Sequence, residues 1–330
     1  MRPLGLGFIG AGEVAARHLA ALKTLAAVRA VAVYDRDPSR GNRGTAAEVL
    51  EDPEVDVVVL TVPHALHEEL AVRAAGAGKH VLVEKPMAVT AAACTRMIAA
   101  AEAAGVLLWV GQQQRQFAHV RAAREILASG ELGAALQYTE VRSNHYGPDR
   151  PAWFFDPDLA GGGIAMLVGI HTIDRAAWVL QATPAAIAAT TETPPGLRIE
   201  TAARGELFLG ELTCRFDWYS DEAFRHETRI DCERGSLQLD AVSLTVRDRH
   251  GTERRVVEFD ADREYTMSFE RQYRALVNTL RDGAPPEITP DEGRAAVATV
   301  EALYASARAG GVRIAIDPLA NSARSDVPTP

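Results

Sequence analysis

The sequence predicts an α/β protein that opens with a doubly wound parallel sheet. Its first apolar run leads straight into a glycine-rich turn, and short apolar runs then alternate with helix-length segments up to about residue 118. Strands and helices that alternate in this way form parallel sheets, because each crossover helix packs on a face of the sheet. A chain of 330 residues is also long for one core. We therefore expect two domains, at residues 1–118 and 119–330.

The first strand, Leu4 to Ile9, and the turn after it form the fingerprint of a dinucleotide site. Gly10-Ala11-Gly12-Glu13-Val14-Ala15 fits G-x-G-x-x-G/A between an apolar strand and a helix that reaches about residue 25. Gly10 makes the tight turn, Gly12 lets the backbone approach a pyrophosphate, and Ala15 keeps the helix close to the strand. The helix N-terminus then stabilises the phosphate charge. The sequence predicts a Rossmann-type domain with a bound dinucleotide.

The second strand, residues 29–34, ends at Asp35, about twenty residues after the glycines. A carboxylate there accepts hydrogen bonds from the adenosine ribose hydroxyls and repels a 2′-phosphate, so Asp35 favours NAD. Arg36, Arg40 and Arg43 crowd the polar loop that follows. One of them can pair with a 2′-phosphate, which leaves NADP open.

The rest of the first domain continues the same alternation. Strands are expected at residues 55–62, 80–84 and 106–111, and helices at about 45–50, 65–77 and 90–104. The single short helix at 45–50 indicates that a helix and edge strand often found at this point are missing. Counted along the nucleotide-binding pattern, we take the strand that ends at Glu84 as the fifth and the strand before Gln112 as the sixth.

Lys85 is the first candidate for a residue that takes part in chemistry. Ligands of an open parallel sheet lie beyond the carboxyl ends of the strands, with the pyrophosphate over the first turn. Lys85 follows the strand at 80–84, where a side chain can face the reactive end of a nicotinamide. The plainer alternative is a solvated lysine before the turn made by Pro86.

Composition and charge exclude several classes of partner. The chain is 47% hydrophobic with mixed charge, as in soluble globular proteins, and no apolar run looks long enough to span a bilayer. Its formal charge of -9 argues against nucleic acid, whose binding needs clustered cations. The three cysteines show no metal or redox spacing and fit a reducing cytoplasm. We expect no membrane, no nucleic acid, no bound metal and a cytoplasmic location.

A set of short motifs follows one order along the first 180 residues. They are Gly7 to Gly12 with His18, Thr61-Val62-Pro63 with His67, Ala74 through Lys85 to Pro86, Gly130-Glu131-Leu132-Gly133, Gly161-Gly162-Gly163, and His171 with Asp174. Together they resemble the glucose-fructose oxidoreductase, inositol dehydrogenase and rhizopine catabolism family (Gfo/Idh/MocA). The ordered set is specific for the family but not for a substrate, since members act on many sugars, polyols and related compounds.

The resemblance implies a C-terminal α/β domain with a large, mainly antiparallel sheet, used for substrate binding and often for contact between subunits of a homodimer or homotetramer. Alternating apolar and polar residues agree at 134–141, 205–216, 226–232, 236–239, 244–246 and 255–259. Helices are expected at 118–129, 269–281 and 291–309, the last two packing back across the molecule. The tail from about residue 318 looks flexible.

The resemblance also implies a site where the two domains meet. The residues expected at the cofactor are Gly10, Ala11, Gly12, Glu13, Val14, Asp35, Arg36, Thr61, Pro63, His67, Glu84 and Lys85. On a helix expected at 164–180, Leu167, His171, Asp174 and Trp178 share one stripe. By resemblance His171 faces the substrate, where its imidazole can exchange the hydroxyl proton during hydride transfer. Lys85 would hold the reacting oxygen.

Leu167 departs from the family's pattern, because an aspartate usually stands four residues before the histidine. A leucine side chain can neither relay a proton nor orient an imidazole. Asp174 can replace the aspartate, or it can form an ion pair with an arginine such as Arg175. The substitution also admits reduction as the natural direction, or a lysine-led mechanism in which His171 mainly binds.

Candidate substrate contacts are Gln113, Arg115, Tyr146, Trp153, His171 and Asp174, which offer hydrogen bonds and an aromatic platform for a sugar or polyol. The leading function is an NAD(P)-dependent oxidoreductase acting on a CH–OH group. Two alternatives remain: a glycoside hydrolase that oxidises its substrate transiently with tightly held NAD, and a non-catalytic nucleotide-binding protein. Consumption of a glycoside without net NADH would indicate the hydrolase, and Leu167 is the best support for the non-catalytic protein.

Overall fold

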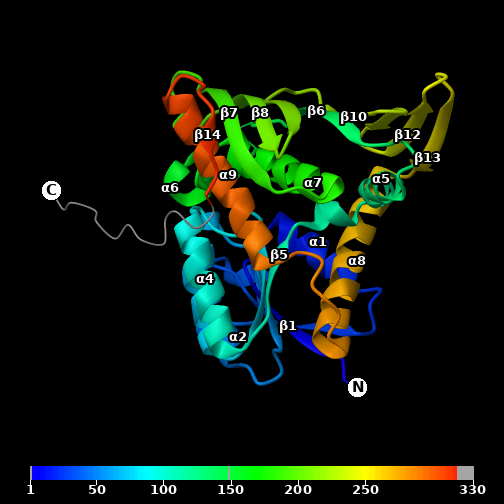
Figure 1. Ribbon diagram of the computed structural model, residues 1–330. Helices are drawn as coiled ribbons and strands as arrows, with labels where there is room; N and C mark the ends of the chain where they lie inside the picture. Colours follow the sequence, from blue (N-terminus) through cyan, green and yellow to red (C-terminus); the bar gives the residue numbers. More distant parts are fainter. Residues whose placement is uncertain (1, 148, 318–330) are drawn as a thin grey trace.

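The computed structural model describes residues 2–147 and 149–317, so the tail that was expected to be flexible lies outside the described residues. Two sheets form separate layers with helices between and around them (Figure 1). The lower sheet is entirely parallel, in the order β2-β1-β3-β4-β5, which confirms the doubly wound prediction. Its strands are β1 (Leu4–Ile9), β2 (Val28–Tyr34), β3 (Val57–Leu60), β4 (His80–Glu84) and β5 (Leu108–Gly111).

The helices of the parallel layer are α1 (Glu13–Leu22), α2 (Ala46–Glu51), α3 (His67–Gly76) and α4 (Ala91–Ala104). Thr45 and Thr90 begin α2 and α4 as N-caps, each accepting a hydrogen bond from the backbone N–H three residues later. Two sequence expectations were wrong. The helix α1 ends at Leu22 rather than near residue 25, and β4 and β5 are the fourth and fifth strands, because residues 35–56 add no strand.

The second sheet has nine strands in the order β13-β12-β11-β10-β6-β9-β8-β7-β14, with one parallel pair, β6 and β9. This confirms a large, mainly antiparallel sheet. Its strands are β6 (Ala135–Ser143), β7 (Pro184–Glu192), β8 (Ala202–Leu209), β9 (Leu212–Tyr219), β10 (His226–Cys232), β11 (Gly235–Leu239), β12 (Ser243–Asp248), β13 (Glu253–Glu258) and β14 (Ile314–Ala315).

The run at 205–216 is two strands and not one, because the chain turns at Gly210, whose φ of 62° suits glycine. The strand β7 was missed altogether, since its alanines and threonines do not alternate clearly between apolar and polar.

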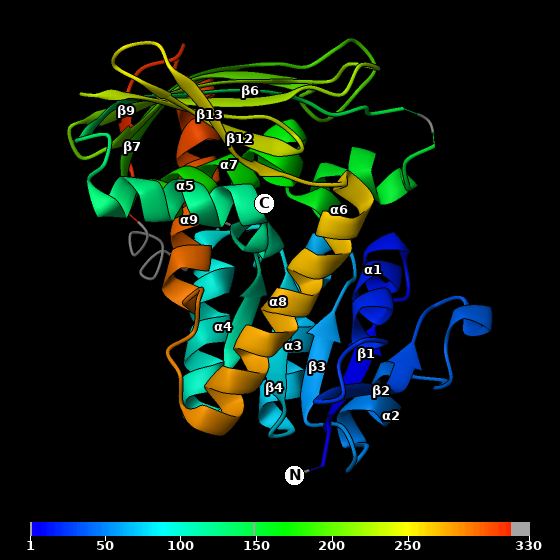
Figure 2. The ribbon, with the colours of Figure 1, turned by 90° about the vertical axis from the view of Figure 1, so that its right-hand side faces the viewer.

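The described residues form five further α-helices beside this sheet: α5 (Ala118–Ser129), α6 (Pro157–Ala160), α7 (Ile170–Leu180), α8 (Ala261–Asp282) and α9 (Pro290–Arg308). Figure 2 shows α5 and α7 beneath the sheet and α8 running down beside the parallel layer. There α8 contacts α1, while α9 contacts α4 and β5. The last two long helices therefore join the layers, as expected, although α8 begins eight residues earlier than the predicted 269.

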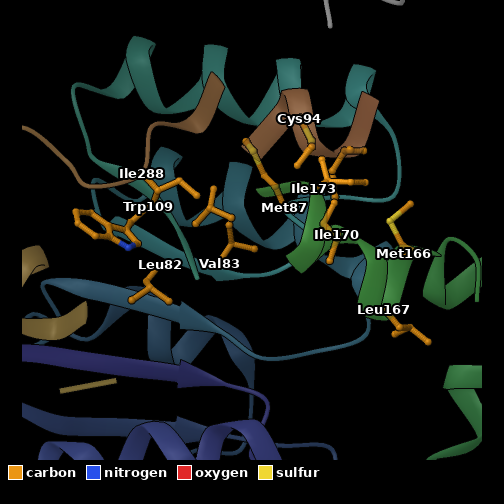
Figure 3. Packing of buried hydrophobic residues seen from close by; sticks show 14 of the residues in the cluster. Leu82, Val83, Met87, Cys94, Trp109, Met166, Leu167, Ile170, Ile173 and Ile288 are labelled. Atoms are coloured by element: carbon orange, nitrogen blue, oxygen red, sulfur yellow. The ribbon is translucent and has the colours of Figure 1, made fainter. Parts of the chain in front are cut away.

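A continuous apolar core runs through the junction of the two layers. Figure 3 shows Leu82 and Val83 of β4, Met87 just after it, and Ile170 and Ile173 of α7, all at most 1% exposed. The end of β4 and the start of α7 are thus fixed against each other. The residues at these two ends are therefore held at a defined separation.

The segment Pro157–Leu180 corrects one expectation from the sequence. It is long and apolar enough to cross a membrane, with a hydropathy of 1.3, whereas no such run was expected. In the fold, 83% of that window is buried, as in the core helix of a soluble protein.

Candidate active site

The turn after β1 is shaped to receive a phosphate. Gly10 has a φ of 96°, and a Cβ there would lie 2.5 Å from the Thr61 carbonyl oxygen. The Thr61 hydroxyl in turn donates a 2.8 Å hydrogen bond to the Gly10 carbonyl. Nothing lies within 4 Å of a Cβ built on Gly12, so its backbone faces open space. Since α1 begins at Glu13, its free N–H groups point at this space, which fits the pyrophosphate of a dinucleotide. Val14 is exposed beside it.

Asp35 is held at the far end of this site by the backbone. One carboxylate oxygen accepts from the Ala11 N–H at 2.7 Å and the other from the Asp37 N–H at 2.9 Å. Each oxygen keeps a further lone pair for a ribose hydroxyl.

Two of the three arginines near Asp35 are engaged with other carboxylates. Arg40 pairs with Asp37 at 3.1 Å, and Arg43 pairs with Asp52 at 2.7 Å. Arg36 is exposed and forms no ion pair with the described residues. Recognition of a 2′-phosphate would therefore depend mainly on Arg36.

A buried hydrogen-bond chain fixes the end of β4. The His18 ring lies 3.0 Å from a Glu84 oxygen and 2.8 Å from the Tyr273 hydroxyl, which joins α1, β4 and α8. The other Glu84 oxygen accepts from the Lys85 N–H at 3.2 Å. His67 is fully buried, with its ring nitrogens 2.9 Å from the Pro86 carbonyl oxygen and 3.0 Å from that of Val62. Glu84 and His67 thus position the backbone around Lys85.

Lys85 reaches from β4 across the junction between the layers. Its ammonium donates a 2.9 Å hydrogen bond to the Leu167 carbonyl oxygen. Burial lowers the pKa of Lys85 to about 8, with Arg142 and Arg150 acting in the same direction and Glu84 opposing them. Both the amine and the ammonium forms of Lys85 are therefore accessible near neutral pH. This property suits a group that exchanges a proton.

The glycine run and a distant glutamate fix the start of the helix that carries His171. A Cβ on Gly163 would lie 2.0 Å from the Glu200 carbonyl oxygen, so the two backbones approach closely. The Glu200 carboxylate accepts from the N–H groups of Gly163 and Ala165 at 2.9 and 3.0 Å, and from the Tyr304 hydroxyl at 2.8 Å. Nothing in the sequence pointed to this cap, because Glu200 lies in a polar loop 37 residues away.

A π-helical turn at Ala165–Gly169, labelled η5, precedes α7. Such turns alter the angular spacing of side chains and occur frequently at functional sites. Leu167 lies in this turn, and its side chain is 6% exposed. Its carbonyl, not its side chain, meets Lys85. The position of the usual aspartate therefore still contacts the lysine, but through the backbone.

His171 is 5% exposed and makes no hydrogen bond with any described residue; its Nδ1 atom is buried without a partner. Burial, followed by the charges of Lys85 and Arg142, holds the pKa of His171 well below its usual value. The imidazole is therefore neutral around pH 7. With Leu167 four residues before it, no carboxylate orients this ring.

Arg115 and Asp174 meet each other. Their side chains form a buried ion pair at 2.6 Å, and Arg115 also donates to the Glu287 carbonyl oxygen at 2.8 Å. The predicted partner of Asp174, Arg175, instead pairs with Glu140. Both Arg115 and Asp174 line a cavity of about 610 Å³ that includes neither Lys85 nor His171. Arg115 and Asp174 are thus engaged with each other, and Asp174 lies one turn after His171 on α7.

The other predicted substrate contacts are Tyr146, Gln113 and Trp153. The Tyr146 hydroxyl is buried without a partner. Gln113 donates to the Tyr265 hydroxyl at 3.4 Å, and its own amide oxygen is unpartnered. Trp153 meets the His64 ring edge-on, with the centroids 4.9 Å apart. The pKa of His64 is held well below its usual value by burial, then by the charges of His67 and Lys85.

The ring nitrogens of His67 lie against two backbone carbonyls, and the His64 Nδ1 atom lies 2.7 Å from the Ala160 carbonyl oxygen. No group of three or more metal-ligating side chains occurs in the part of the chain that the structure describes.

Sequence reasoning missed the polar residues that β6 places over this site. Tyr138, Glu140 and Arg142 share one face of β6, opposite the apolar partners Cys214, Phe216 and Trp218 of β9. The overlooked signal is charged residues at the strand positions that face the interior, since a buried charge needs a partner or a ligand.

Comparison with known proteins agrees with this architecture. Residues 4–112 match the family model described as "Oxidoreductase family, NAD-binding Rossmann fold", and residues 120–238 match the model "GFO/IDH/MocA C-terminal domain". Inositol 2-dehydrogenase 2 of Saccharopolyspora erythraea is 29% identical over 332 residues, covering 93% of this chain and 94% of that protein. D-xylose 1-dehydrogenase (NADP(+)) 2 of Haloferax volcanii is 29% identical over 312 residues, covering 92% and 93%.

A solved structure of levoglucosan dehydrogenase in complex with NADH has the same fold. It superimposes with a TM-score of 0.87 over 96% of this chain and 99% of that one, at 19% identity. Both domains and their mutual arrangement are thus shared with that protein.

Proposed function

The chain belongs to the Gfo/Idh/MocA family of NAD(P)-dependent oxidoreductases, and from this premise we propose that it transfers a hydride between NAD and a hydroxyl or carbonyl carbon of a sugar, inositol or related polyol. The observation that carries the proposal is the placing of Lys85. Its amine lies at the carboxyl end of β4 with a pKa lowered to about 8 and contacts the Leu167 carbonyl, four residues before the neutral imidazole of His171, on whose pKa its charge acts. Relatives named as dehydrogenases of inositol and xylose support a CH–OH substrate.

The residues of the first turn fit the dinucleotide, which when bound supplies a nicotinamide ring that accepts or returns a hydride. Gly10, Gly12 and the first N–H groups of α1 would hold its pyrophosphate, and Asp35 the adenosine ribose. NAD is the favoured cofactor because the Asp35 carboxylate would face the phosphate of NADP, and of the nearby arginines only Arg36 has no carboxylate partner among the described residues. A relative is named for NADP, so NADP remains the second candidate.

Lys85 is the group that moves the proton. In oxidation its neutral amine would take the proton of the substrate hydroxyl while the carbon that bears this hydroxyl gives its hydride to the bound nicotinamide. In reduction its ammonium returns that proton to the carbonyl oxygen. A base with a pKa near the working pH transfers protons more effectively than one with a pKa far below it. The pKa of His171 lies well below its usual value, so His171 is the poorer base near neutral pH. We therefore adopt the mechanism in which Lys85 moves the proton and His171 mainly binds.

His171 then binds the substrate as a neutral hydrogen-bonding ring rather than as the base. Its pKa well below the usual value means that it holds a hydrogen bond without carrying charge at neutral pH.

The cytoplasmic location and the homodimer or homotetramer stay predictions.

The test is a screen of sugars, inositols and their keto forms with NAD and with NADP. Nicotinamide absorbance and product identity are recorded together. Stoichiometric NADH and ketone from a polyol support the proposal. Glycoside cleavage without net NADH would instead identify the transient-oxidation hydrolase, and binding of the dinucleotide without turnover of any compound would favour the non-catalytic protein.

A further inference from the structure

The carboxylates around Lys85 are already engaged by other groups, whereas some of the cations there have no carboxylate partner. Glu84, next to Lys85 in the chain, meets the His18 ring and the Lys85 N–H. Glu140 is the nearest carboxylate on β6, and four donors already occupy it. They are the Tyr138 hydroxyl at 2.6 Å, the Thr228 hydroxyl at 3.1 Å, the Thr172 hydroxyl and the Arg175 guanidinium. Glu140 therefore neutralises Arg175 and has little capacity left for another cation.

Arg142, two residues further along β6, is left without a counterion. Its Nη1 atom donates a 3.1 Å hydrogen bond to the amide oxygen of Gln114, an oxygen that also accepts from Arg175 at 2.8 Å. The Nε atom of Arg142 is buried with no partner, and Arg142 forms no ion pair with the residues that the structure describes. Burial, followed by the charge of Arg175, lowers the pKa of Arg142 to about 10, so it still carries its charge at neutral pH.

Arg150 adds a second cation with neutral partners only. Its guanidinium donates to the His145 carbonyl oxygen at 3.2 Å and to the Asn144 side chain at 3.3 Å. Across residues 2–147 and 149–317 it has no carboxylate partner. After burial and against the opposing charge of Glu84, the charges of Arg142 and Arg150 both lower the pKa of Lys85. After burial and the charge of Glu200, they also act on the pKa of Tyr146, whose buried hydroxyl lacks a partner. Lys85, Arg142, Arg150 and Tyr146 therefore lie within electrostatic range of one another.

A half-buried guanidinium without a counterion is costly, and a planar guanidinium matches a carboxylate or phosphate with two parallel hydrogen bonds. The whole chain is acidic, with a formal charge of -9, so general charge steering does not explain a cationic crevice. Arg142 belongs to β6 of the second sheet, whereas the Gly10–Gly12 turn that would bind the cofactor pyrophosphate follows β1 of the parallel sheet. The two anion-binding positions are therefore distinct.

Resting on the proposed function, we propose that the substrate is an anionic sugar or polyol, carrying a carboxylate or a phosphate, and that Arg142, supported by Arg150, binds this group while Lys85 acts on a neighbouring hydroxyl. A neutral sugar would leave Arg142 unpaired and would bind less tightly. The carboxylate and phosphate sources share this chemistry, and separate arms of the test distinguish them.

The experiment measures binding and turnover in parallel. Calorimetric titration of the NAD-loaded protein uses a panel of uronates, aldonates and sugar phosphates, each beside its neutral parent sugar, and the same panel is assayed for NADH formation. The variants are Arg142→Gln, Arg150→Gln and, as a matched control, Arg229→Gln. Arg229 is also a strand arginine, but it is half-exposed and paired with Asp231 at 2.6 Å.

We expect at least one anion to bind more tightly than its neutral parent, and Arg142→Gln to lower that preference on the order of 10–100-fold, the loss of a charge-assisted hydrogen-bond pair. Arg229→Gln should leave the preference as it is. Uronates or aldonates as the preferred class identify a carboxylate, and sugar phosphates identify a phosphate.

Three results would overturn the inference: neutral parents that bind as well as every anion, an anion preference that survives Arg142→Gln, or a loss of NAD affinity in that variant. Saturable anion binding without any NADH formation would uphold the anion site and reject the proposed oxidoreductase. Turnover of neutral polyols alone would uphold the proposed oxidoreductase and reject the anion site.

Discussion

Replacing Lys85 by methionine should stabilise the folded protein while it removes activity. The pKa of Lys85 falls from 10.5 to about 8 on folding, mainly because of burial, which corresponds to about 3 kcal/mol of destabilisation at pH 7. Methionine has a similar length and no charge. It loses the hydrogen bond to the Leu167 carbonyl, worth about 1 kcal/mol. The free energy of unfolding of Lys85→Met should therefore exceed that of the parent by about 2 kcal/mol at pH 7.

The sign of the pH dependence follows from the same pKa. Between about pH 8 and 10.5 the unfolded chain binds more protons at Lys85 than the folded protein does, so the parent gains stability as the pH rises through this window. The advantage of Lys85→Met is thus complete below pH 8 and lost above about 10.5. Urea unfolding of both proteins at several pH values measures it.

Lys79→Met is the control for this experiment. Lys79 donates two 2.9 Å hydrogen bonds to the Asp52 and Val55 carbonyl oxygens, and methionine would lose both. This variant should be less stable than the parent. If Lys85→Met is also less stable at pH 7, or if its advantage does not change with pH, then Lys85 is not the desolvated amine described above. Lys85→Met should still bind NAD, and its turnover should fall about a hundredfold or more.

Asp35→Ser should narrow or reverse the preference for NAD, because it removes the carboxylate that would face the phosphate of NADP; titration of both cofactors measures this, and a parent that already prefers NADP about tenfold would reject Asp35 as the selector. His171→Gln should lower kcat/KM by about tenfold, the cost of one hydrogen bond, and leave the pH profile in place, whereas a loss of about 10²–10⁴ together with a changed acid limb would make His171 the proton carrier. Arg115→Met should cost about 3–5 kcal/mol in urea unfolding, because it leaves the Asp174 carboxylate buried without its partner, and a change below about 1 kcal/mol would show that the carboxylate is not buried as a charge.

Much of the first domain was predictable because its signals are local. The apolar run and glycines at residues 4–15 fix a strand, a turn and a helix in sequence, and Thr90 and Gly105 mark both ends of α4. The position of Lys85 then follows from the general rule for ligands of parallel sheets.

The chemistry of the site was less predictable because its partners are distant in sequence. Arg115 meets Asp174 across 59 residues, and Glu140 meets Arg175 across 35. The sequence offers several carboxylates as partners for each arginine, and no periodic pattern indicates which one forms the ion pair. The excess charge of Arg142 became visible only when Glu140 was found to be fully occupied.

The pH dependence of kcat/KM for oxidation of the best substrate tests most directly whether Lys85 moves the proton, because this parameter reports the pKa values of the free enzyme. With Lys85 as the base, kcat/KM should rise about tenfold per pH unit on the acid side and level off near pH 8. The corresponding value for reduction should fall above that pH, since the ammonium is then lost. A profile that is flat from about pH 6 to 9, or one that levels off below 6.5 and loses this limb in His171→Gln, would contradict the lysine-led mechanism.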